Sequence, residues 1–394
     1  MMVKDEARVL FSPTQLSEII NTYPNHRFVV QSSNRRTFRN TEYTKLGIEV
    51  CDDVSFADLF LGIKQVPLNQ LISGKFYFFF SHTTKRQPHN RWYLEGLQKS
   101  GITFYDYENL VDSKGQRLVA FGKIAGQLGA YHGLRTYLLK NEGFQLNTPS
   151  PSQKIEDLLN QAKNQNYHNC KIVITGSGNV GQGASLFLSA SGFHKLSPKD
   201  FLTYKGKEAV FTMLSKKHYL KNEKGIFDED EFLEKPSTYK SQFFQYAKKA
   251  NLYIVGHYYH EGMPLLLTKE ALANSQLTIN TIADISCDVH QPLPSCLRSS
   301  TSESPIYGYH KKQHTECDFR DKSAIAVMAI DNLPSELPKR SSIQFGDQFN
   351  EHILPLILRA KQQDNFDSIL NRARIIKQGR FTKRYQYLQE FVAL

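Results

Sequence analysis

No hydrophobic run in this sequence is long enough to cross a membrane. The densest apolar segment, residues 76–80, falls far short of the roughly 20 residues that a spanning helix needs, and it is typical of a buried strand instead. The N-terminus, Met-Met-Val-Lys-Asp-Glu-Ala-Arg, lacks the apolar core of a secretory signal. We therefore expect a cytoplasmic protein that does not bind membranes.

Cysteine is scarce and irregularly spaced. The five cysteines stand at positions 51, 170, 287, 296 and 317, and their number is odd. Their spacings match no zinc-binding pattern, so we expect reduced thiols in a cytosolic setting and no metal site. Internal repeats and long low-complexity segments are also absent.

The length and the apolar content indicate a globular protein with more than one core. At 394 residues the chain exceeds one ordinary domain, so two domains are expected. Hydrophobic residues make up 40%, including 26 Phe and 20 Tyr, which excludes a disordered protein.

The net charge of +11 has two interpretations. It fits a nucleic-acid surface, or a cleft for dicarboxylates and phosphate-bearing cofactors. The basic residues are spread along the chain but are enriched near its end, at Arg372, Arg374, Lys377, Arg380, Lys383 and Arg384. We interpret this tail as a solvated basic helix, and nucleic-acid binding is not expected.

Strand and helix patterns alternate along most of the chain, which predicts an α/β layer fold with mainly parallel sheets. In the first third, 27–31 and 75–80 are typical of strands, and 55–61 and 91–99 of helices. Residues 118–139 predict a long helical crossing, and 215–245 an exposed insertion. Strands are also expected at 252–255, 278–282 and 324–330. A helical tail from about residue 344 is expected to pack back on the first domain.

A glycine-rich turn follows the apolar residues 172–174 and precedes a helical pattern at 184–190. Gly176, Gly178 and Gly181 give the spacing G-x-G-x-x-G, and Asn179 and Val180 lie between the last two. The first glycine allows a tight turn, the second lets the backbone approach a pyrophosphate, and the third lets the helix pack on the strand. The free N–H groups of the helix then face the phosphates. This order predicts dinucleotide binding; the alternative is a strand-to-helix turn with no ligand.

Lys64 and His82 each follow an apolar segment. Ligand crevices form at strand ends in open α/β sheets, so the two side chains could supply the acid/base pair of imine chemistry. His titrates near neutrality, and desolvation can lower the pKa of a lysine toward that range. The alternative is a solvated surface Lys and a structural His.

The chain resembles the saccharopine dehydrogenase (L-lysine-forming) and lysine–2-oxoglutarate reductase group, within the alanine dehydrogenase and transhydrogenase-like superfamily. The glycine turn is one of the stretches that carry the resemblance. The others lie at residues 6–13, 62–67, 80–87, 105–108, 119–126, 283–288 and 329–338.

The resemblance implies two Rossmann-like domains that flank a cleft. Residues 1–137, completed by 340–394, would form the substrate domain, and 138–339 the dinucleotide-binding domain. It also implies roles for single residues. Lys64 and His82 match the acid/base pair; Arg8 and Arg135 match arginines that hold substrate carboxylates; Asp284 and Asp288 match acidic positions beside the nicotinamide ribose; Glu108 matches an acidic substrate-binding position.

The sequence departs from the family pattern at two places. Gln65 replaces an acidic residue that usually follows the catalytic-type lysine, which weakens the case for lysine as the amino donor. Residues 201–204 are interpreted as the second strand of the dinucleotide unit, and Lys205 and Lys207 follow it. Basic groups there suit a 2′-phosphate better than a free hydroxyl, so we expect NADP rather than NAD.

The hypothesis is an NAD(P)-dependent oxidoreductase acting on the CH–NH group of an amino-acid or opine substrate, most like saccharopine dehydrogenase. The alternatives are an alanine dehydrogenase-like enzyme and a non-catalytic dinucleotide-binding protein. The expected partners are a small amino acid and a 2-oxo acid, and a homodimer is one assembly that fits.

Overall fold

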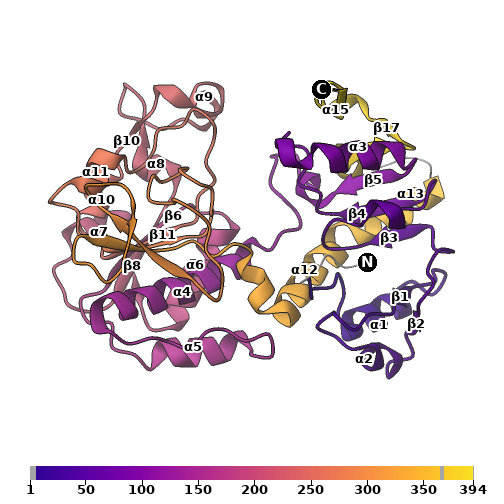
Figure 1. Cartoon of the computed structure of the whole chain (residues 1–394), viewed down its shortest axis with the longest axis horizontal. Helices are drawn as coiled ribbons and strands as arrows, with labels where there is room; N and C mark the ends of the chain where they lie inside the picture. The colour runs from indigo at the N-terminus through magenta and orange to yellow at the C-terminus, as the bar shows by residue number, and fades with distance from the viewer. Residues whose placement is uncertain (1–5, 364–367, 394) are drawn as a thin grey trace. The chain divides into compact units, whose positions relative to one another are not determined.

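The computed structural model describes residues 6–363 and 368–393, and for 360–363 only the backbone. The chain divides into two compact units (Figure 1). Unit 1 contains the residues up to Phe121 and from Pro338 onward, and unit 2 is Gly122–Leu337. The expected boundary after residue 137 falls inside helix α4 (Gly122–Glu142), whereas the division lies before Gly122. The reason is that this helix packs on the sheet and helices of unit 2.

Unit 1 is built on a five-stranded sheet in the order β17-β16-β5-β4-β3. Its strands are β3 (Leu59–Leu61), β4 (Phe76–Phe79), β5 (Thr103–Asp106), β16 (Arg374–Lys377) and β17 (Arg380–Phe381). The first three pair in parallel, and β16 adds antiparallel to β5. Residues Tyr77, Phe78 and Phe79 of β4 are all buried, as expected for a strand covered on both faces. The C-terminal segment therefore completes this sheet.

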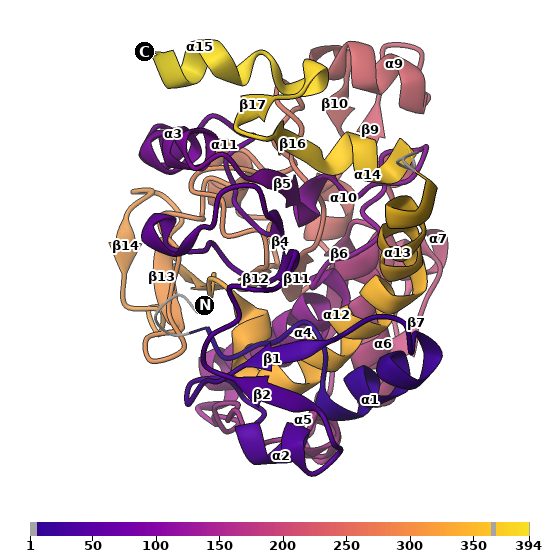
Figure 2. The ribbon, with the colours of Figure 1, turned by 90° about the vertical axis from the view of Figure 1, so that its right-hand side faces the viewer.

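Two buried clusters cover the faces of the unit 1 sheet. One contains Phe78, Tyr105 and Phe349, and the rings of Phe78 and Tyr105 stack with centroids 4.3 Å apart. The other contains Tyr77, Phe79 and residues of α3. The helices are α1 (Pro13–Thr22), α2 (Asn40–Thr44), α3 (Arg91–Lys99), α12 (Pro338–His352), α13 (Leu354–Gln363), α14 (Ser368–Ala373) and α15 (Leu388–Ala393). Short strands β1 (Val29–Gln31) and β2 (Glu49–Cys51) pair beside α1 and α2 (Figure 2).

Two expectations for unit 1 were wrong. The helix expected at 55–61 is loop followed by β3. The basic tail expected as a helix is mostly the hairpin β16–β17, whose buried residues Ile375, Ile376 and Phe381 extend the sheet core. Ile375 and Ile376 are adjacent and both buried, as in a strand that is covered on both faces.

Unit 2 contains an eight-stranded sheet in the order β14-β13-β15-β12-β11-β6-β8-β7. Its parallel strands are β6 (Lys171–Thr175), β7 (His194–Lys195), β8 (Val210–Leu214), β11 (Leu252–Val255), β12 (Thr281–Asp284) and β15 (Ala324–Met328). Strands β13 (Ile306–His310) and β14 (Glu316–Cys317) add antiparallel at one edge. The chain thus extends from β6 to both sides, which makes a doubly wound α/β sheet.

The helices of unit 2 are short except for α4 and α6. They are α5 (Ile155–Lys163), α6 (Asn179–Ala190), α7 (Pro198–Thr203), α8 (Lys216–Tyr219), α9 (Glu229–Glu234), α10 (Phe244–Ala247) and α11 (Lys269–Ala273). The expected exposed insertion at 215–245 includes a small lobe with its own hairpin, β9 (Leu220–Lys221) and β10 (Lys240–Ser241). Phe232 and Tyr239 are buried inside this lobe, so it is a packed element.

Helices α4 and α6 touch through backbone atoms, because glycines lie at their contact. A Cβ atom on Gly126 would lie 2.0 Å from the carbonyl oxygen of Val180, and one on Gly183 would lie 2.0 Å from that of Lys123. Farther along α4, a Cβ on Gly133 would lie 3.1 Å from that of Ala283 in β12. Any side chain at the first two positions would separate the helices.

Among the residues that the structure describes, none of the helices combines the length and the apolar character of a membrane span.

Candidate functional site

The predicted glycine turn lies between β6 and α6, as the sequence indicated. Gly176 has φ +94°, a conformation that favours glycine, and a Cβ there would lie 2.5 Å from the oxygen of Gly256. A Cβ on Gly181 would lie 1.9 Å from the oxygen of Gly176. In contrast, a Cβ on Gly178 would meet nothing within 4 Å. The protein's own packing therefore requires glycine at positions 176 and 181. Gly178 instead leaves open a space that suits a pyrophosphate.

Asn179 and Val180 form the first residues of α6, and the helix begins after the N-cap Gly178. The backbone N–H groups of a first helical turn have no partners within the helix. Together with the positive end of the helix dipole, they favour a bound phosphate group. The residues of this turn thus fit the dinucleotide that the sequence predicted.

The prediction for Lys205 and Lys207 is wrong, because the strand beside β6 is β8 and not 201–204. Residues 198–203 form α7, which starts after the capping residue Ser197. The carbonyl oxygen of Lys207 accepts from the N–H of Asn169, just before β6 begins. Both lysines therefore follow α7 at the amino ends of the parallel strands, opposite the glycine turn.

Residues after β8 take the position beside the glycine turn. The N–H of Gly176 donates to the oxygen of Leu214 over 2.9 Å, so Ser215 begins the segment next to the turn. No acidic residue lies among the next three residues, Lys216, Lys217 and His218. The apolar run 210–214 in the sequence was the signal that could have found this strand.

Asp284 ends β12, on the same edge of the sheet as the glycine turn. It is fully buried; its Oδ1 accepts from the N–H and hydroxyl of Ser286, at 3.0 and 2.6 Å. Its Oδ2 has no hydrogen-bond partner in the described part of the protein. Burial raises the pKa of Asp284 to about 6. Asp288 lies farther along the following loop and is exposed.

His257 is a residue of this edge that the sequence reasoning missed. It follows β11 and is buried, and its Nδ1 lies 2.7 Å from the hydroxyl of Thr175 at the end of β6. Burial lowers the pKa of His257 to about 3, so the imidazole is neutral at physiological pH. A single histidine carries no pattern that would have distinguished it.

Arg135 lies on α4 in unit 2 and is buried. Its Nε donates to the oxygen of Leu146 over 2.9 Å, and its Nη2 donates to the hydroxyl of Thr148 over 3.0 Å. The side chain therefore holds the segment between α4 and α5. Only Nη1 of its nitrogen atoms is buried without a hydrogen-bond partner in the described structure.

The structure brings His82 and Glu108 together in unit 1. His82 follows β4 and Glu108 follows β5, and their Nδ1 and Oε1 atoms are 3.4 Å apart. Arg117 also lies 3.3 Å from the same Oε1. Burial alone would raise the pKa of Glu108, but the hydrogen bond from His82 and the charge of Arg117 lower it to about 2. Glu108 is therefore ionised and orients the imidazole.

Lys64 lies on the neighbouring strand end. The loop after β3 is tied to β4, because Gly62 N–H donates to the oxygen of Phe78 and Phe80 N–H donates to that of Ile63. Gln65 donates from its Nε2 to the oxygen of Ser81 over 2.7 Å. Lys64, His82 and Glu108 thus share the carboxyl edge of the parallel strands in unit 1.

Arg8 is already paired within the protein. Its Nε and Nη2 atoms donate to the two carboxylate oxygens of Glu6, at 2.8 and 2.6 Å, and its guanidinium lies 4.3 Å from the ring centre of Phe121. Glu6, two residues earlier, thus already pairs with the guanidinium, and the role of Arg8 in holding a substrate carboxylate stays a prediction. A substrate carboxylate would have to compete with this bidentate pair.

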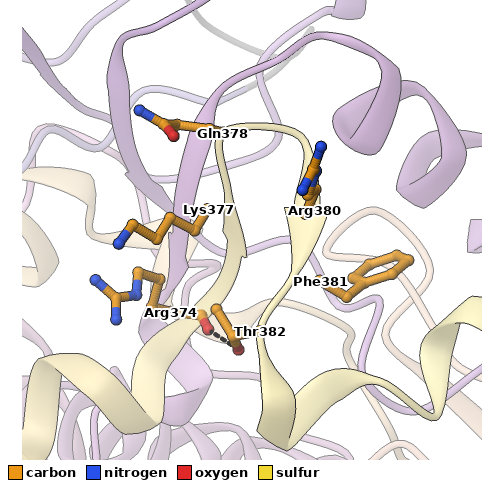
Figure 3. A pocket seen from close by; sticks show the side chains of 6 residues that line it. All are labelled: Arg374, Lys377, Gln378, Arg380, Phe381 and Thr382. Carbon is orange, nitrogen blue, oxygen red and sulfur yellow. Dashed lines mark hydrogen bonds between the residues drawn. The ribbon is translucent and has the colours of Figure 1, made fainter.

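One surface hollow on unit 1 has a basic lining. Its volume is about 580 Å³, and it is lined by Arg374, Lys377, Gln378, Arg380, Phe381 and Thr382 of the hairpin β16–β17 (Figure 3). None of the predicted site residues lines it. In the described residues, no group of His, Cys, Asp and Glu side chains could hold a metal ion.

Known proteins share this sequence pattern and this fold. Residues 2–127 match the family described as alanine dehydrogenase/PNT, N-terminal domain. The alpha-aminoadipic semialdehyde synthase of Rattus norvegicus is 28% identical over 98% of this chain, which spans less than half, 46%, of that protein. The L-lysine-forming, NAD(+) saccharopine dehydrogenase of Emericella nidulans is 23% identical over 91% of the chain and 90% of the relative.

The chain is thus similar to oxidoreductases of the saccharopine dehydrogenase group. An L-alanine dehydrogenase structure covers 100% of the chain and 97% of its own with a TM-score of 0.62 at 14% identity. The transhydrogenase of Sinorhizobium meliloti covers 97% of the chain and 98% of its own with a TM-score of 0.55 at 11% identity. These two structures show the two-domain α/β fold that the chain shares.

The different demands on the glycines predict different effects of substitution. Gly178→Ala should leave the melting temperature unchanged and weaken dinucleotide binding about tenfold or more, because the new methyl group enters only the open space. Gly126→Ala is the matched variant, and it should lower the melting temperature, because its methyl group meets the backbone of Val180. Thermal shift and calorimetric titration with NAD(P)H measure both. Equal dinucleotide affinity for wild type and Gly178→Ala would contradict the assignment.

The buried carboxyl group of Asp284 predicts a pH-dependent stability. Its folded-state pKa is raised, so the wild type loses free energy of unfolding as pH rises from about 4 to about 6. Asp284→Asn lacks this loss. The free energy of unfolding of the variant minus that of wild type should therefore rise by about 1 kcal/mol between pH 5 and 7.5. Urea unfolding at both pH values measures the difference, with the exposed Asp288→Asn as control. A constant difference would show that Asp284 is not buried as an ionisable acid.

Proposed function

We propose that this protein catalyses nicotinamide-dependent reduction of an imine formed between an amino donor and a 2-oxo acid, as in saccharopine formation. The observation that carries the proposal is the 3.4 Å contact between His82 and Glu108 at the strand edge that also presents Lys64. The open space at Gly178 in the other unit supports a dinucleotide as the second reactant. The named relatives support the reaction class.

The side chains of unit 1 fit the proton transfers of this chemistry. The attacking amine must lose a proton, and the carbonyl oxygen must gain protons to leave as water. The imidazole of His82 can accept or donate a proton, and Glu108 holds it in one orientation. Lys64 is the second group at this edge for the same transfers. A bound nicotinamide cofactor supplies the hydride.

The amino donor is the less constrained part of the proposal. Gln65 brings no negative charge to the site, and its amide nitrogen is engaged by the oxygen of Ser81. Glu108 is therefore the acidic residue at this edge that could face the charged end of lysine. This difference favours testing ammonia as the alternative donor, as in an alanine dehydrogenase-like reaction.

The catalytic assignment predicts a loss of turnover in two variants. His82→Ala and Lys64→Met should each lower kcat about 100-fold or more, because each removes a proton-transferring group. NAD(P)H oxidation is followed spectrophotometrically with lysine plus 2-oxoglutarate and, separately, with ammonia plus pyruvate. His89→Ala is the control, since this histidine is exposed and lies in the same loop region. Wild-type turnover only with ammonia and pyruvate would overturn the saccharopine proposal, and full activity of both variants would overturn the assignment of residues.

We further propose NADPH as the preferred cofactor, on different residues from those that the sequence suggested. The segment after β8 lies beside the glycine turn. Its first residue is Ser215, which carries a hydroxyl group. Lys216 is 2.5 Å from Glu229, whereas Lys217 is exposed. In a dinucleotide fold, an acidic residue in this region binds the 2′-hydroxyl of NAD, and a basic group accommodates the 2′-phosphate. Ser215 and Lys217 therefore support a phosphate better than a free hydroxyl.

This cofactor proposal separates Lys217 from Lys205. Lys217→Ala should lower the kcat/KM ratio of NADPH to NADH about tenfold, because one charge-assisted contact to phosphate is lost. Lys205→Ala should leave the ratio unchanged, because Lys205 lies at the other end of the strands. Initial rates with both cofactors give the ratios. The reverse pattern, with only Lys205→Ala changing the ratio, would contradict the position assigned to the ribose.

A further inference from the structure

A buried carboxylate, that of Asp106, is hydrogen-bonded to both segments that carry His82 and Glu108. Asp106 ends β5 and has no exposed surface. Its Oδ2 accepts from the backbone N–H of Ser81 over 3.1 Å and from the Ser81 hydroxyl. Its Oδ1 accepts from the N–H of Glu108 over 2.9 Å. One carboxylate therefore binds the loop after β4 and the loop after β5 at once.

The loop that carries His82 needs such an anchor. His82 has φ +58°, a left-handed conformation that is costly for a residue with a side chain. Its neighbours are held on both sides, because the Ser81 hydroxyl lies 2.7 Å from that of Thr83 and Asn90 donates to the oxygen of His82 over 3.0 Å. The imidazole itself stays 42% exposed. The loop thus presents an accessible ring on a constrained backbone.

We propose that Asp106 is a positioning residue for catalysis. It fixes the distance between the His82 imidazole and the Glu108 carboxylate by bonding to both of their loops. This inference rests on the proposed function of that pair. Asp106 does not itself touch the substrate, since it has no exposed surface.

The charge state of Asp106 bears on this role. Burial, and the charge of Glu108 beside it, raise the pKa of Asp106 to about 6, against the opposing hydrogen bonds from Ser81. The other titratable groups that interact with it are Tyr107 from its own loop, Tyr93 of α3 and Tyr385 near the C-terminus. The ionised carboxylate accepts all three hydrogen bonds, whereas the protonated form must place an O–H group among these three donors. Asp106 should therefore hold the segments of His82 and Glu108 most firmly above about pH 6, where its carboxylate is ionised.

The test compares Asp106→Asn with Asp53→Asn, an exposed aspartate of the same unit that also accepts from a backbone N–H, that of Ser55. Asp106→Asn should lower kcat about tenfold or more with little change in the KM for NADPH, and it should displace the acid limb of the pH profile. Ser81→Ala removes the hydrogen bond from the Ser81 hydroxyl to Asp106. It should change kcat and the acid limb in the same direction, and it replaces Asp106→Asn as the test if that variant does not fold. Asp53→Asn should match wild type.

A second readout does not depend on turnover. The imidazole ring signals of His82 in the NMR spectrum of ¹³C-histidine-labelled protein should shift in Asp106→Asn, because Glu108 no longer holds the ring in one orientation. Unchanged His82 ring signals together with an unchanged pH profile would overturn the positioning role. If wild type showed no turnover with any substrate pair, the proposed function would fail, while the His82 ring signals would still decide whether Asp106 positions His82 and Glu108.

Discussion

The structure of unit 2 depends on a contact between backbones that only glycine permits. The third glycine of the turn lies so close to the first that a Cβ on Gly181 would overlap the oxygen of Gly176. Helix α4 lies equally close behind, with Gly126 against Val180. The first turn of α6 is therefore fixed from two sides. Its N–H groups are held in place before a ligand arrives, which lowers the entropy that binding must overcome.

The polar groups of the candidate active site in unit 1 are also held in place by the protein, but by hydrogen bonds and not by close backbone contacts at glycines. The parallel strands β3, β4 and β5 bring Lys64, His82 and Glu108 to one edge. These three residues lie in the segments that follow the strands, so the sheet alone does not set the distances between their side chains. The buried carboxylate of Asp106 supplies the missing constraint. Both units thus place polar groups at the carboxyl ends of parallel strands, where α/β sheets bind ligands.

Much of this arrangement could be predicted from the sequence, and the failures have physical causes. The glycine turn was recognisable because Gly176, Gly178 and Gly181 have a fixed spacing between a strand and a helix. The neighbouring strand was misplaced, because Phe201 and Leu202 of the short helix α7 were interpreted as part of a strand. Glu6 was missed as the partner of Arg8, and Asp106 was missed as an anchor. Their roles arise from burial and from contacts between strands, which one sequence does not display.

The central claim is that the glycine turn binds a nicotinamide dinucleotide through its pyrophosphate. A crystal structure of the protein with NADPH tests it most directly. The pyrophosphate is predicted to lie against Gly178 and the first N–H groups of α6, with the 2′-phosphate beside Ser215 and Lys217. A dinucleotide bound elsewhere, or a turn that stays empty at saturating NADPH and NADH, would contradict the account.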